Sequence, residues 1–189
     1  GRMSGVVEVE RGTTIRTVLE DIVDGIRDGK DFKAVQLGGA SGTFIAEEDI
    51  DTPIEFEAMR EKGIVMGAGG FVVIDDSSCM VDLVRYYMEF IRRESCGKCI
   101  PCREGTGRML EILESVIKKP ANEESGTTLE RLKGVMQLET ISQVMKDTSL
   151  CGLGQTAPNP FMSALRNFRE EFEEHIFDRK CRANVCRGL

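Results

Sequence analysis

Residues 94–105 read Glu-Ser-Cys-Gly-Lys-Cys-Ile-Pro-Cys-Arg-Glu-Gly, and Cys151 follows far downstream in Ser-Leu-Cys-Gly-Leu-Gly. Two successive C-x-x-C spacings place Cys96, Cys99 and Cys102 on one tight loop. A cubane iron-sulfur cluster needs a fourth soft ligand, which a remote segment can supply. Because Cys151 is suited to that role, the pattern predicts an iron-sulfur cluster held by helices on both sides of the loop.

Two other uses of these cysteines are less favoured. Zinc is satisfied by one C-x-x-C pair with two further ligands, so a third cysteine at the same spacing fits a cluster better. Disulfide pairing is disfavoured because the chain has 7 cysteines, an odd number, and their spacing is typical of metal ligation in a reducing compartment. Glycines beside the cysteines allow close approach of N–H groups to sulfur or simply form turns: Gly97, Gly105, Gly152 and Gly154. Three basic residues either offset the charge of a cluster or are solvated: Lys98, Arg103 and Arg108.

The bulk composition predicts a chain that folds in water. Its 189 residues are 41% hydrophobic and 30% charged, enough for one large core or two small domains. The net charge of −7, without a Lys/Arg-rich block, argues against nucleic-acid binding. No apolar run approaches the roughly 20 residues of a membrane helix, and no secretory signal opens the chain. We therefore expect a cytoplasmic protein with protein partners and no direct membrane insertion.

The first part of the chain has the pattern of a small sheet carrying one helix. Predicted strands lie at residues 6–9, 34–37, 54–56 and 71–74. A turn at residues 12–14 precedes a helix with an apolar face formed by Ile15, Val18, Leu19, Ile22 and Val23.

From Met80 onward the apolar period changes from two to 3.6, which predicts a helical domain. Asp75 and Asp76 precede the first helix and are suited to cap its N-terminus. The second helix is predicted to end near residues 118–120, before a linker at residues 121–126. Apolar faces of the four later helices are Met109, Ile112, Leu113 and Val116; Leu129, Leu132 and Met136; Ile141, Val144 and Met145; and Phe161, Ala164, Leu165, Phe168, Phe172 and Ile176. The last of these helices opens at Asn159-Pro160.

The cysteine stretch, together with Thr148-Ser149-Leu150-Cys151-Gly152-Leu153-Gly154, closely resembles the NADH-binding flavin subunit of respiratory complex I and of NAD(P)-linked, electron-bifurcating hydrogenases. Gly38-Gly39-Ala40-Ser41-Gly42 and the strands around it resemble that family's SLBB domain, a β-grasp module. The resemblance covers nearly the whole chain. It implies an α+β fold with an SLBB domain at residues 1–76, a cluster-binding helical bundle at residues 77–178 and a cysteine-containing tail at residues 179–189.

What the resemblance implies is an electron relay. It assigns one [4Fe-4S] cluster, which takes electrons one at a time from FMN, to Cys96, Cys99, Cys102 and Cys151. FMN and NAD(P) belong to a domain that precedes the SLBB module in the family; we expect this domain to be missing from the chain, so no catalytic residue is assigned. The glycines at residues 38–42 are not a dinucleotide fingerprint, because no following helix receives a pyrophosphate. Implied partners are a thioredoxin-like [2Fe-2S] subunit and a ferredoxin-like or hydrogenase subunit.

Cys79, His175, Cys181 and Cys186 remain, and three thiols with one imidazole suit a tetrahedral zinc site. Alternatively, His175 is a buried structural histidine and Cys79 a small core residue. A second [2Fe-2S] or [4Fe-4S] cluster ranks below zinc, because histidine with irregular cysteine spacing is less usual for iron-sulfur ligation. Resemblance of Cys79 and the tail to the hydrogenase branch, where the tail leads into a ferredoxin-like domain, favours a zinc clamp at a hinge.

The leading functional prediction is an electron-transfer segment of an NAD(P)-linked, flavin-containing oxidoreductase of hydrogenase or electron-bifurcating type. The runner-up is a complex I-type dehydrogenase subunit, and a third interpretation is a non-redox, metal-stapled scaffold. An autonomous hydrolase has little support, because His175 is the only imidazole and no base lies near a credible nucleophile in the sequence.

Overall fold

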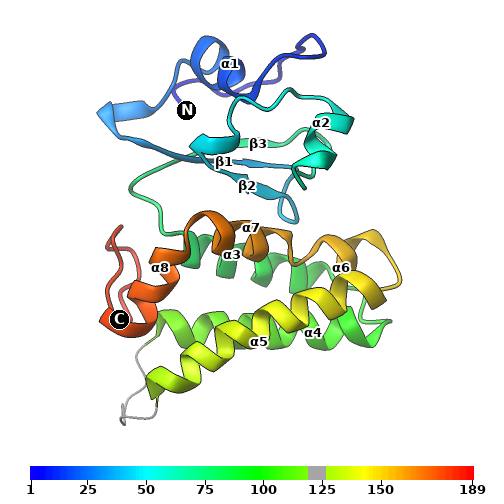
Figure 1. Ribbon diagram of the computed structural model, residues 1–189, viewed down its shortest axis with the longest axis vertical. Helices are drawn as coiled ribbons and strands as arrows, with labels where there is room; N and C mark the ends of the chain where they lie inside the picture. Colours follow the sequence, from blue (N-terminus) through cyan, green and yellow to red (C-terminus); the bar gives the residue numbers. More distant parts are fainter. Residues whose placement is uncertain (119–126) are drawn as a thin grey trace. The chain divides into compact units, whose positions relative to one another are not determined.

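A computed structural model describes residues 1–118 and 127–189, and its helices and small antiparallel sheet confirm the predicted α+β class (Figure 1). The chain divides into two compact units, Gly1–Ser77 and Ser78–Leu189. The predicted linker at residues 121–126 lies outside the described residues. Among the described helices, none combines the length and apolar character that a bilayer span requires.

The first unit is built on an antiparallel sheet in the order β2-β1-β3. The central strand β1 (Phe32–Leu37) pairs with β2 (Thr43–Ile45) on one side and with β3 (Phe71–Asp75) on the other. Gly38 follows β1 at a φ of +95°, and a Cβ atom there would overlap the carbonyl oxygen of Val65. The tight turn between β1 and β2 therefore requires glycine at this position.

Short helices cover the sheet of the first unit. They are α1 (Ile15–Thr17), the π-helix η1 (Val18–Ile22), the 3₁₀ turns η2 (Arg27–Gly29) and η3 (Glu47–Asp49), and α2 (Phe56–Glu61). Their apolar sides and the sheet enclose one core, formed by Ile15, Leu19, Val35, Leu37, Ile45, Ile50, Met59 and Ile64. The helix predicted from the apolar face at residues 15–23 is thus present, although most of it has π geometry.

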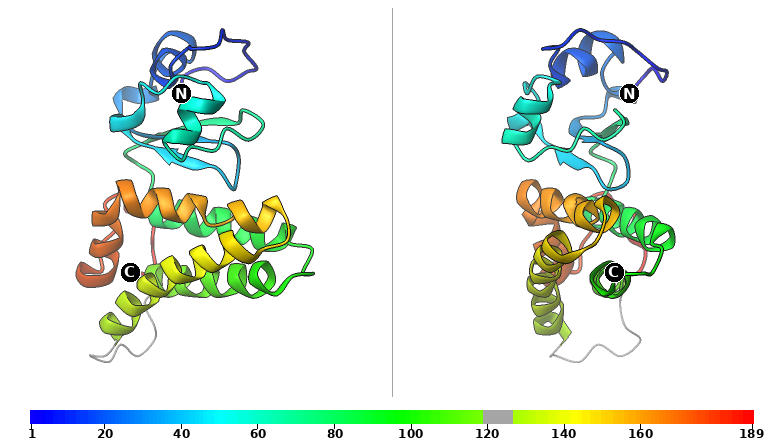
Figure 2. Two further views of the ribbon diagram at one scale, coloured as in Figure 1. Left: turned by 45° about the vertical axis from the view of Figure 1, so that its right-hand side comes forward. Right: turned by 90° about the vertical axis from the view of Figure 1, so that its right-hand side faces the viewer.

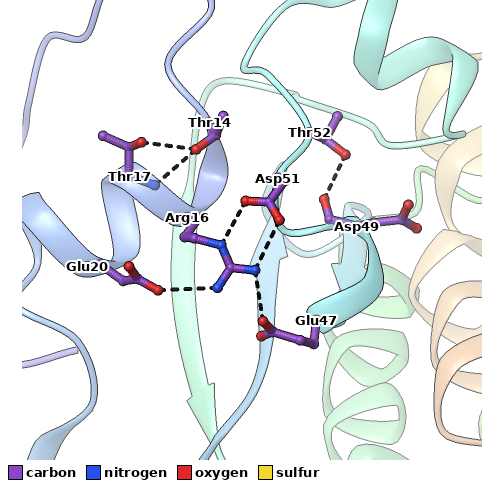
Figure 3. A network of polar contacts seen from close by, with 8 residues as sticks. All are labelled: Thr14, Arg16, Thr17, Glu20, Glu47, Asp49, Asp51 and Thr52. Atoms are coloured by element: carbon purple, nitrogen blue, oxygen red, sulfur yellow. Dashed lines mark hydrogen bonds and ion pairs between the residues drawn. The ribbon is translucent and has the colours of Figure 1, made fainter.

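Arg16 links two of these segments at the surface (Figure 3). Its guanidinium donates to Asp51 at 2.7 Å and to Glu47 at 2.8 Å, which lie in and just after η3, and to Glu20 at 3.3 Å. The hydrogen bond from Arg16 lowers the pKa of Asp51. Three carboxylates around one guanidinium hold α1 against η3, with the modest strength expected of exposed ion pairs.

Two predicted strands in this unit are wrong, and one strand escaped prediction. Residues 6–9 form no strand, and Val6 is fully exposed, because this segment has no partner strand among the described residues. Residues 54–56 lead into helix α2 instead. The missed strand β2 has only 3 residues, too few to show a period of two.

The second unit is a bundle of helices (Figures 1 and 2). Their bounds are α3 (Met80–Glu94), α4 (Ile100–Ile117), α5 (Thr127–Thr148), α6 (Gly152–Thr156), α7 (Asn159–Asn167), α8 (Arg169–Glu173) and the π-helix η4 (Glu174–Asp178). Helix α3 packs against α4 and α7, and α5 and α6 both pack against α4. In the core, the rings of Phe161 and Phe172 meet edge to face with centroids 6.0 Å apart.

The bundle departs from prediction in its helix boundaries. The two predicted helices around Leu132 and Val144 are one continuous helix, α5. The predicted last helix breaks at Phe168, whose φ of −134° is not helical. Asp75 and Asp76 do not cap α3, because its N-cap is Cys79 and Asp75 instead accepts the backbone N–H of Ser77.

Candidate metal centres

The three clustered cysteines lie where a loop becomes a helix. Cys99 is the N-cap of α4, Pro101 occupies its first turn, and Cys102 is already inside it and buried. The helix therefore begins earlier than the apolar pattern alone indicated. Gly97 makes the turn between Cys96 and Cys99 with a φ of +72°, a left-handed conformation that favours glycine. Cys96, at the outer end of the loop, is exposed.

The segment around Cys151 lies beside this loop. Cys151 is exposed and is the N-cap of α6, and the backbone N–H of the preceding Leu150 donates to the Cys99 sulfur. A Cβ atom on Gly154 would lie 3.0 Å from the Cys102 Cβ and 2.6 Å from the Ser149 Cβ. Only a glycine lets α6 approach α4 this closely, and the approach brings the Cys151 segment to the cysteine loop.

Gly105, the other glycine beside the cysteines, has a related role. A Cβ atom there would lie 2.5 Å from the Met145 sulfur, so Gly105 gives α5 room to pack against the first turns of α4. Gly152 differs from both, since a Cβ atom on it would meet nothing within 4 Å. Close helix packing, in addition to turn geometry, thus explains two of the glycines that the sequence places near the cysteines.

Hydrogen-bond donors point at the sulfurs of the loop. The backbone N–H groups of Leu150 and Cys102 lower the pKa of Cys99 and outweigh the opposing effect of burial. The Ser95 hydroxyl lies 3.2 Å from the Cys102 sulfur and accepts the Gly97 N–H at 3.3 Å. Groups that favour a thiolate are suited to metal ligation, because the thiolate is the binding form. Ser95 is a contributor that the cysteine spacing did not single out.

The basic residues near the loop have defined partners. Arg103 donates to the Gly97 carbonyl at 2.8 Å and to Glu104 at 2.9 Å, so it fixes the loop as well as adding positive charge. Arg108 pairs with Glu111 at 3.1 Å on the exposed surface of α4. Lys98 is exposed on the loop itself. Arg103 is therefore the basic side chain most directly tied to the geometry of the cysteines.

A second group of ligand types comes together at the other end of the bundle. The ligand atoms of Cys79, His175, Cys181 and Cys186 all lie within 4.8 Å of one another. The Cys79 sulfur is 3.3 Å from His175 Nε2 and 3.7 Å from the Cys186 sulfur. Cys79 and His175 are almost fully buried, at 2% and 1% exposure. Because these distances are those of ligands around a single ion, the geometry fits a tetrahedral metal site.

The contacts within this group shift the pKa values of its members in different directions. The hydrogen bond from Cys186 lowers the pKa of Cys79 and overcomes the effect of burial, and with His175 it brings that pKa to about 4. The same contact raises the pKa of Cys186. Burial lowers the pKa of His175, but the hydrogen bond to Cys79 and the charge of that group outweigh burial, and the pKa rises to about 8. These contacts favour the thiolate form of Cys79, which is the form that ligates a cation.

Two residues that the sequence did not single out hold this group in place. Glu171 accepts the buried N–H of Met80 at 3.0 Å, and its backbone carbonyl lies 2.6 Å from His175 Nδ1. Arg179 donates to the carbonyls of Val116, His175 and Lys118 at 2.9 to 3.0 Å. Arg179 therefore ties the start of the tail to the end of α4. No local pattern in the sequence identifies contacts of this range.

The cysteine loop lies in a region that matches a known sequence family. Residues 82–175 match the family described as NADH-ubiquinone oxidoreductase-F iron-sulfur binding region. The match includes all four cysteines predicted to hold the cluster.

Relatives extend the similarity over nearly the whole chain. The NADP-reducing hydrogenase subunit HndC of Solidesulfovibrio fructosivorans is 44% identical over 185 residues, which cover 98% of this chain and 36% of that protein. The NADH-quinone oxidoreductase F subunit of Escherichia coli is 38% identical over 177 residues, covering 91% of this chain and 37% of that protein. The chain thus spans less than two fifths of the length of either relative.

A solved structure supports the same fold. An NAD⁺-reducing [NiFe]-hydrogenase in the H₂-reduced state matches with a TM-score of 0.69 and 26% identity, over 88% of this chain and 26% of that chain. The sequence and structure comparisons therefore agree on one group of proteins.

Proposed function

Because residues 82–175 match the family described as NADH-ubiquinone oxidoreductase-F iron-sulfur binding region, we propose that this chain is the electron-relay segment of an NAD(P)-linked, flavin-containing oxidoreductase. The observation that carries the proposal is the approach of two remote segments. The Leu150 N–H reaches the Cys99 sulfur, and Gly154 lies against Cys102, so Cys151 is brought to the cysteine loop.

Cys96, Cys99, Cys102 and Cys151 would hold a [4Fe-4S] cluster in this arrangement. Four sulfur donors with N–H groups directed at them have the chemistry that such a cluster requires. When bound, the cluster supplies one-electron transfer between a flavin and a further carrier. Cys102 would be the inner, buried ligand, whereas Cys96 and Cys151 are exposed and would mark the edge at which electrons enter or leave.

The chain's own residues set the properties of this centre. With the cysteines bound as thiolates, the Ser95 hydroxyl and the N–H groups of Leu150 and Cys102 would donate to sulfur, which would stabilise added negative charge and raise the reduction potential. Arg103 holds the loop through Gly97. Gly154 excludes any side chain between α6 and α4, which keeps the Cys151 segment close to Cys102.

FMN, NAD(P) and the partner subunits would be supplied by the rest of a longer protein and its complex. We propose a thioredoxin-like [2Fe-2S] subunit and a ferredoxin-like or hydrogenase subunit as partners. A hydrogenase or electron-bifurcating type is favoured over a complex I type by the 44% identity with the hydrogenase subunit, against 38% with the Escherichia coli dehydrogenase subunit. None of the seven cysteines forms a disulfide bond, which suits a reducing compartment such as the cytoplasm.

Anaerobic reconstitution tests the relay. The protein should become brown, bind about four irons and give an EPR signal after reduction. Cys151→Ala should lose most of the iron, while Cys181→Ala should keep it. A colourless protein, or a Cys151→Ala variant with full iron content, would contradict the proposal and favour a non-redox scaffold.

We further propose that Cys79, His175, Cys181 and Cys186 bind one structural zinc ion. Ligand atoms within 4.8 Å of one another support zinc over a second iron-sulfur cluster, whose ligands must surround several metal atoms. Cys79 precedes α3, His175 lies in η4 and the other two cysteines are in the tail, so one ion would join both ends of the bundle. Such a redox-inert clamp suits a hinge leading to a further electron-carrying domain.

Metal analysis of the purified protein tests the clamp. One zinc per chain is expected, and Cys181→Ser should lose it without losing iron. Full zinc content in the Cys181→Ser variant would contradict the assignment.

A further inference from the structure

Glu171 contacts both sides of the Cys79 group, from which we infer that it is a positioning residue of the metal site; this inference rests on the zinc proposal. Its side chain is buried, at 4% exposure, in the short helix α8. One end of the residue faces the segment that carries Cys79, and its backbone faces His175. Glu171 therefore contacts the residue next to one proposed ligand, Cys79, and the ring of another, His175.

The carboxylate fixes Cys79. Glu171 Oε2 accepts the N–H of Met80 at 3.0 Å, and Met80 is the first residue of α3, directly after Cys79. The side chain of Cys79 makes no capping hydrogen bond, so the acceptor for this N–H comes from across the bundle. A negative charge at the start of a 15-residue helix is favoured by the helix dipole, which offsets the cost of burying a carboxylate.

The backbone carbonyl fixes His175. It lies 2.6 Å from Nδ1, a contact that requires a proton on Nδ1 because the carbonyl can only accept. In the neutral ring, which is the form that ligates a metal, Nε2 then carries the lone pair, and it faces the Cys79 sulfur at 3.3 Å. Metal-binding histidines typically have their second ring nitrogen held by a carbonyl or carboxylate in this way, which selects the tautomer that can ligate.

One residue therefore sets the position of a thiolate and the orientation of an imidazole that lie 96 residues apart in sequence. The simpler alternative is that Glu171 only stabilises the start of α3. The two roles differ in what they predict for the folded protein. A capping role changes the temperature of unfolding alone, whereas a positioning role also changes the affinity for the metal and the ligand field around it.

The test uses Glu171→Ala and Glu171→Gln in the full 189-residue chain with its cluster reconstituted. Zinc affinity is measured by competition with a chelator, and Co²⁺ replaces zinc as a spectroscopic probe. Glu171→Ala should bind zinc about 10- to 100-fold more weakly and shift the cobalt absorption bands, the range seen when groups behind metal ligands are removed. Glu171→Gln keeps an oxygen acceptor for the Met80 N–H and should restore most of the affinity.

Two matched variants separate the explanations. Glu173→Gln removes the same charge from an exposed position of α8, and Ser142→Ala removes a buried hydrogen bond to Leu138 in α5, far from the site in sequence. Ser142→Ala should lower the unfolding temperature, while neither variant should change zinc affinity or the cobalt spectrum.

Each outcome has one meaning. Unchanged zinc affinity and cobalt bands in a folded Glu171→Ala protein overturn the positioning role and leave the zinc site standing. A wild-type protein that binds no zinc or cobalt overturns both proposals. If Glu171→Ala does not fold, Glu171→Gln decides. Normal cobalt bands with most of the wild-type affinity are the expected result, and a loss of affinity as large as that of Cys181→Ser would overturn the role of Oε2 as acceptor.

Discussion

The two proposed metal centres of the bundle are built in opposite ways. The cysteine loop offers exposed ligands, Cys96 and Cys151, on short segments that end at helix N-termini. The Cys79 group buries its central ligands, with His175 only 1% exposed. An exposed edge allows electrons to pass to a partner, whereas a buried site excludes partners and is suited to holding chain segments together.

The contrast extends to the contacts behind the ligands. Donors to sulfur dominate at the loop, where Ser95 and two backbone N–H groups reach the cysteines. Acceptors and long-range ties dominate at the clamp, where Glu171 and Arg179 bind groups on other helices. Donors adjust how much charge a cluster can hold, and ties adjust how firmly helices are joined. If both proposals hold, the bundle separates a redox role from a structural one.

Removal of zinc should produce the largest effect on stability and leave the cluster intact. A chelator strong enough to strip the Cys79 site removes a ligand that stabilises the folded state by about 4 kcal/mol when present at about 1,000 times its Kd. Thermal unfolding of the bundle, followed by circular dichroism, should shift to lower temperature, and re-addition of zinc should reverse the shift. The iron content should not change. Loss of iron together with zinc would show that the two centres are not separate.

Arg179→Asn should weaken the clamp without touching a ligand. Arg179 has a φ of +52°, a conformation that asparagine tolerates, so the substitution removes the bonds to the Val116, His175 and Lys118 carbonyls but not the turn. Hydrogen bonds to charged groups contribute about 1.5–3 kcal/mol, and we expect a loss of this size in chemical denaturation. Zinc affinity should fall as well. A stability equal to that of the unaltered protein would mean that the tail needs no tie to α4.

Gly154→Ala should act on the other centre. The added methyl group would lie 2.6 Å from the Ser149 Cβ and 3.0 Å from the Cys102 Cβ, an overpacking that costs about 1–3 kcal/mol. Iron content after reconstitution should drop while zinc content stays at one per chain. Gly152→Ala is the control, because its Cβ would meet nothing within 4 Å. Equal iron content in both variants would mean that the cluster does not depend on a glycine at position 154.

The sequence predicts a feature of these two centres well where its contacts are local in the chain, and poorly where they join distant residues. The regular spacing of Cys96, Cys99 and Cys102 is local, so the sequence predicts the cysteine loop directly. The same is true of the amphipathic helices at Met80 and Met109. The sequence also predicts the members of the Cys79 group, because one histidine and three cysteines remain once four cysteines are assigned to the cluster. Its proposed use as a zinc site still depends on metal analysis.

The sequence does not predict the contacts that span the bundle. Glu171 and Arg179 act through a backbone N–H and backbone carbonyls far away in the chain, and no residue pattern records such partners. The break at Phe168 and the continuity of α5 were missed for a similar reason, since tertiary packing overrides local periodicity. The short strand β2 is defined by its pairing with β1 alone. The assignment of residues 1–76 to a β-grasp module stays a prediction.

Ser95→Ala should give the smallest effect, confined to the redox centre. With Cys102 bound as a thiolate, the Ser95 hydroxyl 3.2 Å away must donate to sulfur, and this bond favours the more negative, reduced cluster. Its loss should make the reduction potential more negative by about 20–65 mV, which corresponds to one hydrogen bond of about 0.5–1.5 kcal/mol for a one-electron couple. Potentiometric EPR titration measures the shift. Ser115→Ala, which removes a hydroxyl bound to the Ile112 carbonyl later in α4, should leave the potential unchanged. A positive shift in Ser95→Ala would mean that the hydroxyl does not donate to Cys102, and the donors at the loop would then be the backbone N–H groups alone.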